Sequence, residues 1–464
     1  MRSCLFCVLV FASTQGCVGK SRGFDSAQTL IHDRSGVRVE QRDPEELAET
    51  RAVLEQLRSP LAAEGAIEVA LIQNPMLQAA FERLAVARGE LLGARLWPNP
   101  TVEVEATFDP DGGSPDLEGA FVLDLGGILR QRLMGRAAEA SLRAAEVEAA
   151  GAALDLAYET RVAFYAHQAD LQIVELVVAM TMTFRGAYET ADALREAGNV
   201  QLLEVAQNRA AYEQARLVIA SAELAALESR EKLQVLMGLS GEATGWQIGA
   251  RLEGTPLAPS DFDALETVAI DASLDLLGKS AQLEGLARNL DIVRSASVIP
   301  SLHAGIRAER GDNGWGIGPV VEFTVPLFDQ GQGPRAAGAA RLRAAQHQYL
   351  AMGVSVRSAA RRLRNRYANA EARLAFFEET LLPAQEEVLR QTLLQYNAMG
   401  AGVFQLLVAR RALLDAQKGR LEARRDLWIA HAAIDQLRAG RVVDLEGFSN
   451  GSNEMQSQSA GGGH

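Results

Sequence analysis

The sequence predicts a mainly α-helical protein in which one unit, made of two short strands, a very long helix and a returning helix, occurs twice. Residues 128–197 contain no proline and are rich in Ala, Leu, Glu and Arg, which are strong helix formers. The same order of motifs recurs about 200 residues later, so that Leu77 corresponds to Leu277. Pro100 corresponds in the same way to Pro300. The sequence therefore predicts an internal duplication.

The long helix determines the kind of assembly that is expected. At 1.5 Å per residue, a helix over 128–197 is on the order of 100 Å long and has no core of its own. We expect it to be a strut in a coiled-coil assembly. Gly198 and Asn199 break the helix, and a second helical run over 202–239 leads the chain back along it.

Composition excludes several classes of function. The chain has 464 residues and a net charge of −13, so no basic face is expected that would bind nucleic acid. All three cysteines lie within the first 17 residues, which leaves no disulfide framework and no cysteine metal site in the rest of the chain. The six histidines are scattered without the spacing of metal ligands. We expect no catalytic site, no metal site and no cofactor.

The two ends of the sequence are predicted to lie outside the repeated units. Residues 1–17 have a positive start and an apolar run too short to cross a bilayer, as a signal peptide has. Cys17 follows Thr14-Gln15-Gly16, which resembles a bacterial lipoprotein box except at Thr14, where a bulky aliphatic residue is usual. A covalent lipid such as palmitate on Cys17 is expected, the alternative being an ordinary signal peptide. Residues 18–65 are interpreted as a polar N-terminal arm and 441–464 as a disordered tail.

The first unit is predicted over residues 66–260. Asn74 precedes Pro75 and is the expected cap of a helix that ends before Pro98. Strands are expected at 101–108 and 119–125, and these lead into the long helix. In the first strand, apolar residues such as Val102 alternate strictly with polar residues such as Glu103.

The second unit is predicted over residues 261–440. Its strands are expected at 301–309 and 317–327, its long helix at 334–397 and its returning helix at 403–437. Pro383 is expected to kink the long helix.

The strands have the length and the two-faced pattern of transmembrane β-strands. Four strands cannot close a barrel, and an open edge cannot lie in lipid, so copies of the chain must close it. Two copies give eight strands and three give twelve, which leaves room for a passage. The alternative is that the strands belong to an ordinary sandwich in a soluble domain.

Motifs in both units resemble the TolC family of outer-membrane efflux proteins. They are Asn74-Pro75-Met76-Leu77, Leu96-Trp97-Pro98-Asn99-Pro100, Val325-Pro326-Leu327-Phe328-Asp329, and Tyr396 to Gly400 followed by Phe404-Gln405-Leu406-Leu407. The resemblance implies a homotrimer, in which a twelve-stranded barrel in the bacterial outer membrane continues into a twelve-helix α-barrel in the periplasm. The Leu-Trp-Pro-Asn-Pro stretch is similar to the branch that serves heavy-metal efflux pumps.

The function that the resemblance implies is a passive exit duct of a tripartite efflux pump. Such a duct docks on a periplasmic adaptor, or membrane fusion protein, and on an inner-membrane transporter, which selects the substrate. The alternative from another class is a lipid-anchored periplasmic coiled-coil scaffold or adaptor. An adaptor would need a lipoyl-like β-sandwich divided by one helical hairpin, whereas this sequence predicts two hairpins and no such sandwich.

The resemblance also implies functional residues at the ends of the helical hairpins. Gly198, Asn199, Gly400 and Gly402 match the family's tip motifs, which contact the adaptor, although turn residues alone would have the same pattern. Glu204 and Gln405 occupy matching positions and are candidates for the gate, while Glu204 is also suited to stabilising a helix N-terminus. Polar residues predicted to face the barrel lumen are Glu103, Glu105, Asp124, His303, Arg307 and Glu322.

Overall fold

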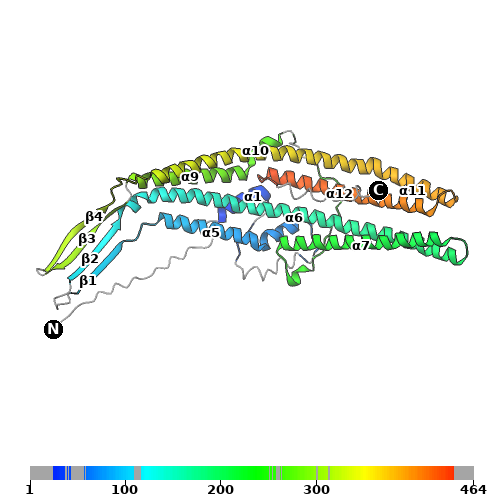
Figure 1. Ribbon diagram of the computed structural model, residues 1–464, viewed down its shortest axis with the longest axis horizontal. Coiled ribbons are helices and arrows are strands. Elements are labelled where there is room, and N and C mark those ends of the chain that lie inside the picture. The colour runs from blue at the N-terminus through cyan, green and yellow to red at the C-terminus, as the bar shows by residue number, and fades with distance from the viewer. Residues whose placement is uncertain are drawn as a thin grey trace.

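The computed structural model describes residues 24–36, 39, 41–42, 57, 59–108, 116–249, 251–252, 254–257, 262, 264–298, 301–311 and 314–443. The molecule is long and narrow, with a small sheet at one end and two helical hairpin tips at the other (Figure 1). The predicted signal peptide with Cys17, most of the predicted tail and the loop 109–115 lie outside the described residues.

The first unit contains the longest helix of the described chain. In chain order its elements are α4 (Ala63–Gln73), α5 (Pro75–Arg95), β1 (Thr101–Thr107), β2 (Asp116–Asp124), α6 (Leu125–Glu196) and α7 (Leu202–Met237). With 72 residues, α6 is about 108 Å long at 1.5 Å per residue. The predicted long and returning helices are therefore present, with small shifts at their ends.

The second unit repeats this order. Its elements are α8 (Leu265–Ala272), α9 (Leu274–Val298), β3 (Leu302–Gly311), β4 (Gly314–Phe323), α10 (Gln332–Phe376), the π-helix η2 (Phe377–Leu381), α11 (Leu382–Asn397) and α12 (Val403–Arg438). The 3-10 helix η1 (Gly241–Thr244) lies between the two units in the sequence.

Equivalent capping residues begin the helix that precedes the strands in each unit. The Asn74 side chain accepts hydrogen bonds from the backbone N–H groups of Met76 and Leu77 at 2.8 and 3.1 Å, as predicted. In the second unit the Ser273 hydroxyl accepts a hydrogen bond from Leu276 N–H at 3.1 Å. These breaks separate α4 from α5 and α8 from α9.

The helices form long struts that lie side by side. α6 packs against α5 and α7 on one side and against α9 and α12 on the other, while α10 packs against α9 and α12. Figure 1 shows the same order, with α10 and α11 at one edge and α5 and α7 at the other. Two large clusters of buried side chains lie where α4 and α8 join the struts, around Phe164 and Tyr367.

The four strands form one antiparallel sheet in the order β1-β2-β3-β4. In β4 the predicted range 317–327 is wrong, since the strand spans Gly314–Phe323 and so begins and ends earlier. It ends at Phe323 because that residue pairs with Leu302, the first residue of β3, and Pro326 has no N–H for a ladder. Its start has a glycine at every second position, from Gly314 to Gly318, and glycine is typical of loops, so the predicted strand begins too late.

The predicted kink at Pro383 takes the form of a π-helix. Because Pro383 has no N–H, it cannot donate to the carbonyl four residues earlier. The ladder widens over η2, where Leu382 N–H bonds to the Phe377 carbonyl, and the helix continues as α11.

Two predictions about the ends of the chain are corrected. The arm predicted over 18–65 contains a helix, α1 (Phe24–Ser35), whose Phe24 ring packs edge-on against Phe81 at 4.7 Å between centroids. The tail was placed from residue 441, but Arg441 is held by ion pairs and Val443 is buried. Both segments gain their order from packing on the helices, which local composition does not report.

Candidate functional site

The first helical tip is closed by a left-handed glycine, as predicted. α6 ends at Glu196, and Gly198 has a φ of 81°. The backbone N–H of Asn199 bonds to the Leu194 carbonyl at 2.8 Å, and that of Gly198 to the Arg195 carbonyl at 2.8 Å. This is a Schellman-type end, which satisfies the last carbonyls of the helix.

The second tip has the same hydrogen bonds but uses a different residue. Gly400 N–H bonds to the Gln395 carbonyl at 2.8 Å, so that Met399 occupies the place of Gly198. Met399 has a φ of 59°, which L-residues rarely adopt. Neither Gly400 nor Gly402 has a positive φ, so the left-handed position of this tip is Met399 and not one of the two glycines named from the sequence. The repeat spacing, which aligns Gly198 with Met399, is the signal that could have identified it.

A hydrogen bond joins the two tips. The Tyr396 hydroxyl, on α11, donates to a Glu204 carboxylate oxygen on α7 at 3.2 Å. Burial and the Glu204 charge both raise the pKa of Tyr396, so the hydroxyl keeps its proton near neutral pH. Arg410 lies close to Tyr396 and is half-buried, and its Nη1 has no hydrogen-bond partner among the described residues. Glu204 thus connects two hairpins that are 192 residues apart in the sequence.

Gln405 has a local role in this structure. Its side-chain oxygen accepts a hydrogen bond from Gly402 N–H at 2.6 Å, which caps the start of α12. Glu204 and Gln405 occupy equivalent positions, but only Glu204 bonds to the other hairpin within the described part of the chain.

An apolar groove of about 370 Å³ lies between the hairpins near the tips. α6 contributes Val177 and Phe184, α7 contributes Val218, and α12 contributes Phe404 and Leu407. Its lining is mainly apolar, in contrast to the hydrogen bond at Tyr396. The groove and this bond together show that the two hairpins meet through a few polar contacts and an incompletely filled apolar seam.

All six polar residues predicted to face one lumen lie on one face of the sheet. Directly paired residues in antiparallel strands share a face, and the register pairs Glu103 with Ala120 and Ala120 with Arg307. Asp124, His303 and Glu322 are paired across three strands. The carboxylates on this face are Glu103, Glu105, Asp116, Glu118, Asp124, Glu309 and Glu322.

The basic groups on the described part of the polar face are Arg307 and His303. Arg307 Nε lies 3.0 Å from a Glu118 carboxylate oxygen, and His303 Nε2 lies 4.0 Å from Asp124. This face therefore has a clear excess of negative charge.

The opposite face of the sheet is exposed and mainly apolar, with Arg310 as its charged residue near the end of β3. Val104 is 80% exposed and Ile317 is 75% exposed, although both belong to regular strands. Large hydrophobic residues exposed on this face are Val102, Val104, Phe121, Ile306, Trp315, Ile317, Val321 and Phe323. A continuous apolar face of this size on a two-sided sheet marks contact with lipid or protein.

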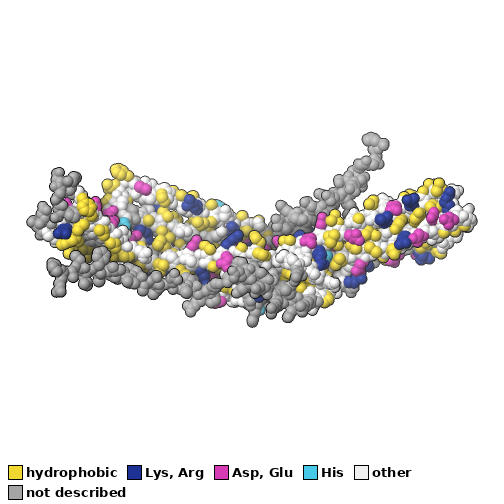
Figure 2. All heavy atoms as spheres, turned by 90° about the horizontal axis from the view of Figure 1, so that it is seen from below, with side chains coloured by type: hydrophobic (Ala, Val, Ile, Leu, Met, Phe, Trp, Pro, Cys, Tyr) yellow, Lys and Arg dark blue, Asp and Glu magenta, His cyan; other side chains and the backbone are white. Residues whose placement is uncertain are grey.

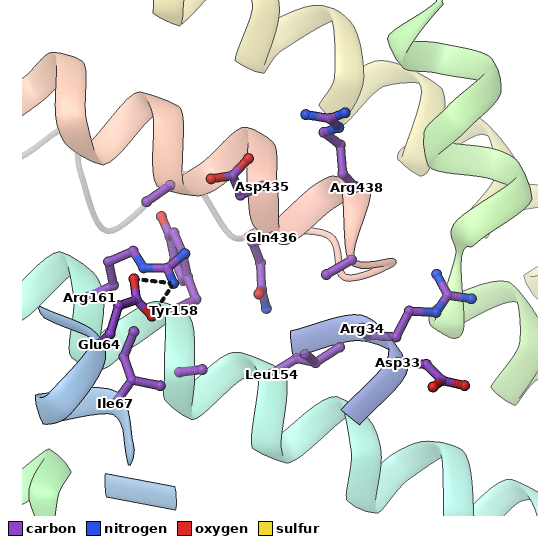
Figure 3. A pocket seen from close by; sticks show the side chains of 13 residues that line it. Asp33, Arg34, Glu64, Ile67, Leu154, Tyr158, Arg161, Asp435, Gln436 and Arg438 are labelled. Atoms are coloured by element: carbon purple, nitrogen blue, oxygen red, sulfur yellow. Dashed lines mark hydrogen bonds and ion pairs between the residues drawn. The ribbon is translucent and has the colours of Figure 1, made fainter. Parts of the chain in front are cut away.

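Halfway along the molecule, α1, α4, α6 and α12 surround a polar pocket of about 390 Å³ (Figure 3). Arg161 pairs there with Glu64 at 3.1 Å, and the buried Tyr158 hydroxyl has no hydrogen-bond partner among the described residues. Three arginines and three carboxylates line the pocket, so it has no preference for one sign of charge.

A clamp that the sequence analysis missed joins the two units near this pocket. Arg441 forms ion pairs with Asp155 on α6 and Asp275 on α9, and Val442 N–H bonds to Asp275 at 3.0 Å. Gly151 leaves room for the guanidinium, since a Cβ there would lie 3.1 Å from Arg441 Cζ. The sequence signal was an arginine directly after Gly440, a left-handed turn residue.

Within the described ranges, no group of three or more His, Cys, Asp or Glu side chains is arranged to hold a metal ion. None of the helices in the described part of the chain is both long enough and apolar enough to cross a membrane.

Comparison with known proteins identifies similar chains. No protein-family model matches the sequence. The chain is 24% identical over 383 residues to the cobalt-zinc-cadmium resistance protein CzcC of Cupriavidus metallidurans, and the match covers 82% of this chain and 90% of CzcC.

Solved structures show the fold. CusC, whose structures concern transmembrane channel formation, superposes with a TM-score of 0.63 at 16% identity, covering 82% of this chain and 92% of CusC. The outer membrane protein VceC of Vibrio cholerae superposes with a TM-score of 0.68 at 19% identity, covering 82% of this chain and 97% of VceC. The described chain therefore has the fold of these proteins, and the predicted resemblance is confirmed.

Proposed function

We propose that this chain, which has the fold of the TolC-family outer-membrane channels, is the passive outer-membrane exit duct of a tripartite efflux pump. The observation that carries the proposal is the sheet, with its exposed apolar face and its acidic polar face. An apolar face is stable against lipid, and a polar face is stable against a water-filled passage. The long struts then extend into the periplasm.

Three copies of the chain would form the duct. β1 and β4 are the edges of the sheet and have no partner strand on their outer sides among the described residues of this protomer. An unpaired edge is unfavourable in lipid, where no water satisfies its backbone groups. Pairing β1 of one copy with β4 of the next closes twelve strands when three copies meet, which is wide enough for a passage.

The tips would contact the periplasmic adaptor and the inner-membrane transporter. The turn between α6 and α7, which contains Gly198 and Asn199, and the turn between α11 and α12, which contains Met399, lie at the end farthest from the sheet (Figure 1). In this proposal the bond between Tyr396 and Glu204 holds the two hairpins of one copy together when the duct is closed.

Metal cations are the proposed substrate. The supporting observations are the similarity to CzcC, a protein of cobalt, zinc and cadmium resistance, and the acidic face of the sheet. Negative charge along a passage raises the local concentration of cations. The transporter would select the metal, and the duct would pass it.

A covalent lipid on Cys17 is proposed as a second anchor. The acyl chain alone gives only marginal attachment to a membrane. Together with the sheet it would fix the protomer in the outer membrane while the trimer forms.

Placing charge on the apolar face of the sheet tests the proposal. In Val102→Lys, Val104→Lys and Ile306→Lys, a charge would face lipid, at a cost of roughly 2–4 kcal/mol each near the centre of the bilayer. We expect these variants to be absent from isolated outer membranes and to give no conductance in planar bilayers. Thr101→Lys and Thr107→Lys place the same charge on the polar face and are the matched controls. Normal insertion of the first set would refute the proposal.

A further inference from the structure

The two outer edges of the helical part carry exposed seams of side chains at coiled-coil spacing. On α7 the seam that faces away from α6 consists of Leu217, Leu224, Leu227, Glu231 and Val235. The four apolar side chains in this set are between 56% and 72% exposed. Figure 2, which views the molecule from the side of α5 and α7, shows hydrophobic side chains exposed among charged ones along this edge.

The edge formed by α10 has a second exposed seam. Its members at the same spacing are Arg343, Leu350, Val354, Arg357, Arg361 and Arg364. All six are exposed, with Leu350 at 64% and Val354 at 68%. Between Asp329 and Glu371 the sequence contains eight arginines and no acidic residue, although the chain as a whole has a net charge of −13.

The opposite edge has acidic side chains where α10 has basic ones. Exposed residues on α5 include Glu82 and Val86, and on α7 they include Glu231. Neither Glu231 nor Arg343 has an ion-pair partner among the described residues. Glu82 accepts a hydrogen bond from Gln41 at 2.8 Å and forms no ion pair within the described residues. The two edges are thus complementary in both spacing and charge.

We propose that α10 of one copy docks on α5 and α7 of a second copy, and that ion pairs between these edges select the partner and its register. This inference rests on the proposed trimer and adds the residues that recognise the next copy. Because the two edges differ, the contact is head-to-tail, and repeating it closes a ring. Charged positions beside an apolar seam set partner choice and alignment in coiled coils.

The duplication places the opposite charges at the same height. A Cβ on Gly338 would lie 2.9 Å from Leu290, so residue 338 of α10 and residue 290 of α9 lie at the same height along the long axis. Residue 90 of α5 is the equivalent of residue 290 in the first unit, so it lies at this height as well. When the copies are related by an axis along the struts, α5 of one copy runs antiparallel to α10 of the next. Glu82 precedes residue 90 by eight residues, so it lies within about one helical turn of Arg343 of the next copy.

An ion pair within the chain shows that a second pair of opposite charges lies at matching heights, nearer the tips. Arg373 on α10 lies 3.4 Å from Asp426 on α12, and the position equivalent to Asp426 in the first unit is Ala225 on α7. By the same counting, Glu231 is level with residue 367 of the next copy, within about one turn of Arg364. Arg364 also interacts within its own chain, and an exposed guanidinium with several N–H donors can serve both contacts.

Charge reversal on each edge tests the inference in the full-length protein extracted from outer membranes. One variant combines Arg343→Glu with Arg364→Glu, and another combines Glu82→Arg with Glu231→Arg. We expect each to raise the concentration at which half of the particles dissociate at least tenfold, as measured by light scattering. A chain with all four changes has the opposite charges restored across the contact, and its particles should regain the wild-type mass.

Arg341→Glu with Arg362→Glu is the matched control. It makes the same change in net charge on α10 but lies off the seam, and its particles should keep the wild-type mass. Any of three results would overturn the inference: single-edge variants that keep the wild-type mass, a control that dissociates, or a fourfold variant that does not regain the wild-type mass. None of these results would contradict a trimeric wild-type duct. A monomeric wild type would instead overturn the proposed trimer itself. Circular dichroism of each variant separates loss of assembly from loss of folding.

Discussion

Removing the Arg441 side chain should weaken the joint between the two units. Arg441→Met leaves the Asp155 and Asp275 carboxylates close together without their cation, and Asp275 is only 13% exposed. Breaking a buried ion pair by deleting one partner costs roughly 3–5 kcal/mol. Because Asp155 is 36% exposed and solvent screens part of its charge, we expect a loss of about 2 kcal/mol.

The assay is urea unfolding of the detergent-solubilised protein, followed by circular dichroism. Arg441→Met, Asp275→Asn and the double variant form a cycle that isolates the interaction between the two side chains. Asp275→Asn removes one of the uncompensated charges, so the double variant should lose less stability than the two single variants combined. The matched control is Arg251→Met, which breaks an exposed ion pair with Glu175 and should cost less than about 1 kcal/mol.

Two results would refute this account of the clamp. One is an Arg441→Met protein as stable as the Arg251→Met control. The other is strict additivity in the cycle, which would mean that the ion pair contributes nothing beyond the packing of each side chain. Gly151→Ala gives an independent check, because its methyl group would push the guanidinium away from the carboxylates.

Three further predictions concern other parts of the chain. Burial and the Arg230 charge lower the pKa of His167 from 6.5 to about 4. The contribution of neutral His167 to the free energy of unfolding is therefore full above pH 6.5 and falls by up to roughly 3 kcal/mol as the pH drops toward 4. His167→Gln should flatten this pH dependence in thermal unfolding, and an unchanged slope would contradict the prediction. Tyr396→Phe removes the hydrogen bond to Glu204, which is worth about 1 kcal/mol. This variant should raise the open fraction of the duct about fivefold in planar-bilayer recordings, whereas the control Tyr188→Phe should leave the open fraction unchanged. Cys17→Ala should abolish incorporation of labelled palmitate, and retained label would place the lipid elsewhere.

The repeated helices and strands could be predicted because their signals are local. Proline-free stretches, alternating strands and the Asn74-Pro75 cap each depend on neighbouring residues, and the structure has these elements within a few residues of the predicted ends. The two faces of the sheet followed in the same way, because alternation along each strand fixes which residues share a face.

The parts that were missed depend on contacts between distant residues. Helix α1 is short and polar and gains its order from packing on Phe81. Met399 adopts a left-handed conformation because the reversal between α11 and α12 requires it there, against its own preference. The Arg441–Asp275 ion pair and the Tyr396–Glu204 hydrogen bond join residues that are 166 and 192 positions apart, and no local pattern reports such a pairing.

The mass of the particle extracted in detergent from isolated outer membranes, measured by light scattering, tests whether copies of this chain close a barrel in the membrane. We expect three chains per particle, since three four-stranded sheets close twelve strands. A single chain that washes from the membrane with carbonate or salt would contradict it, because the apolar face of the sheet would then not lie in lipid.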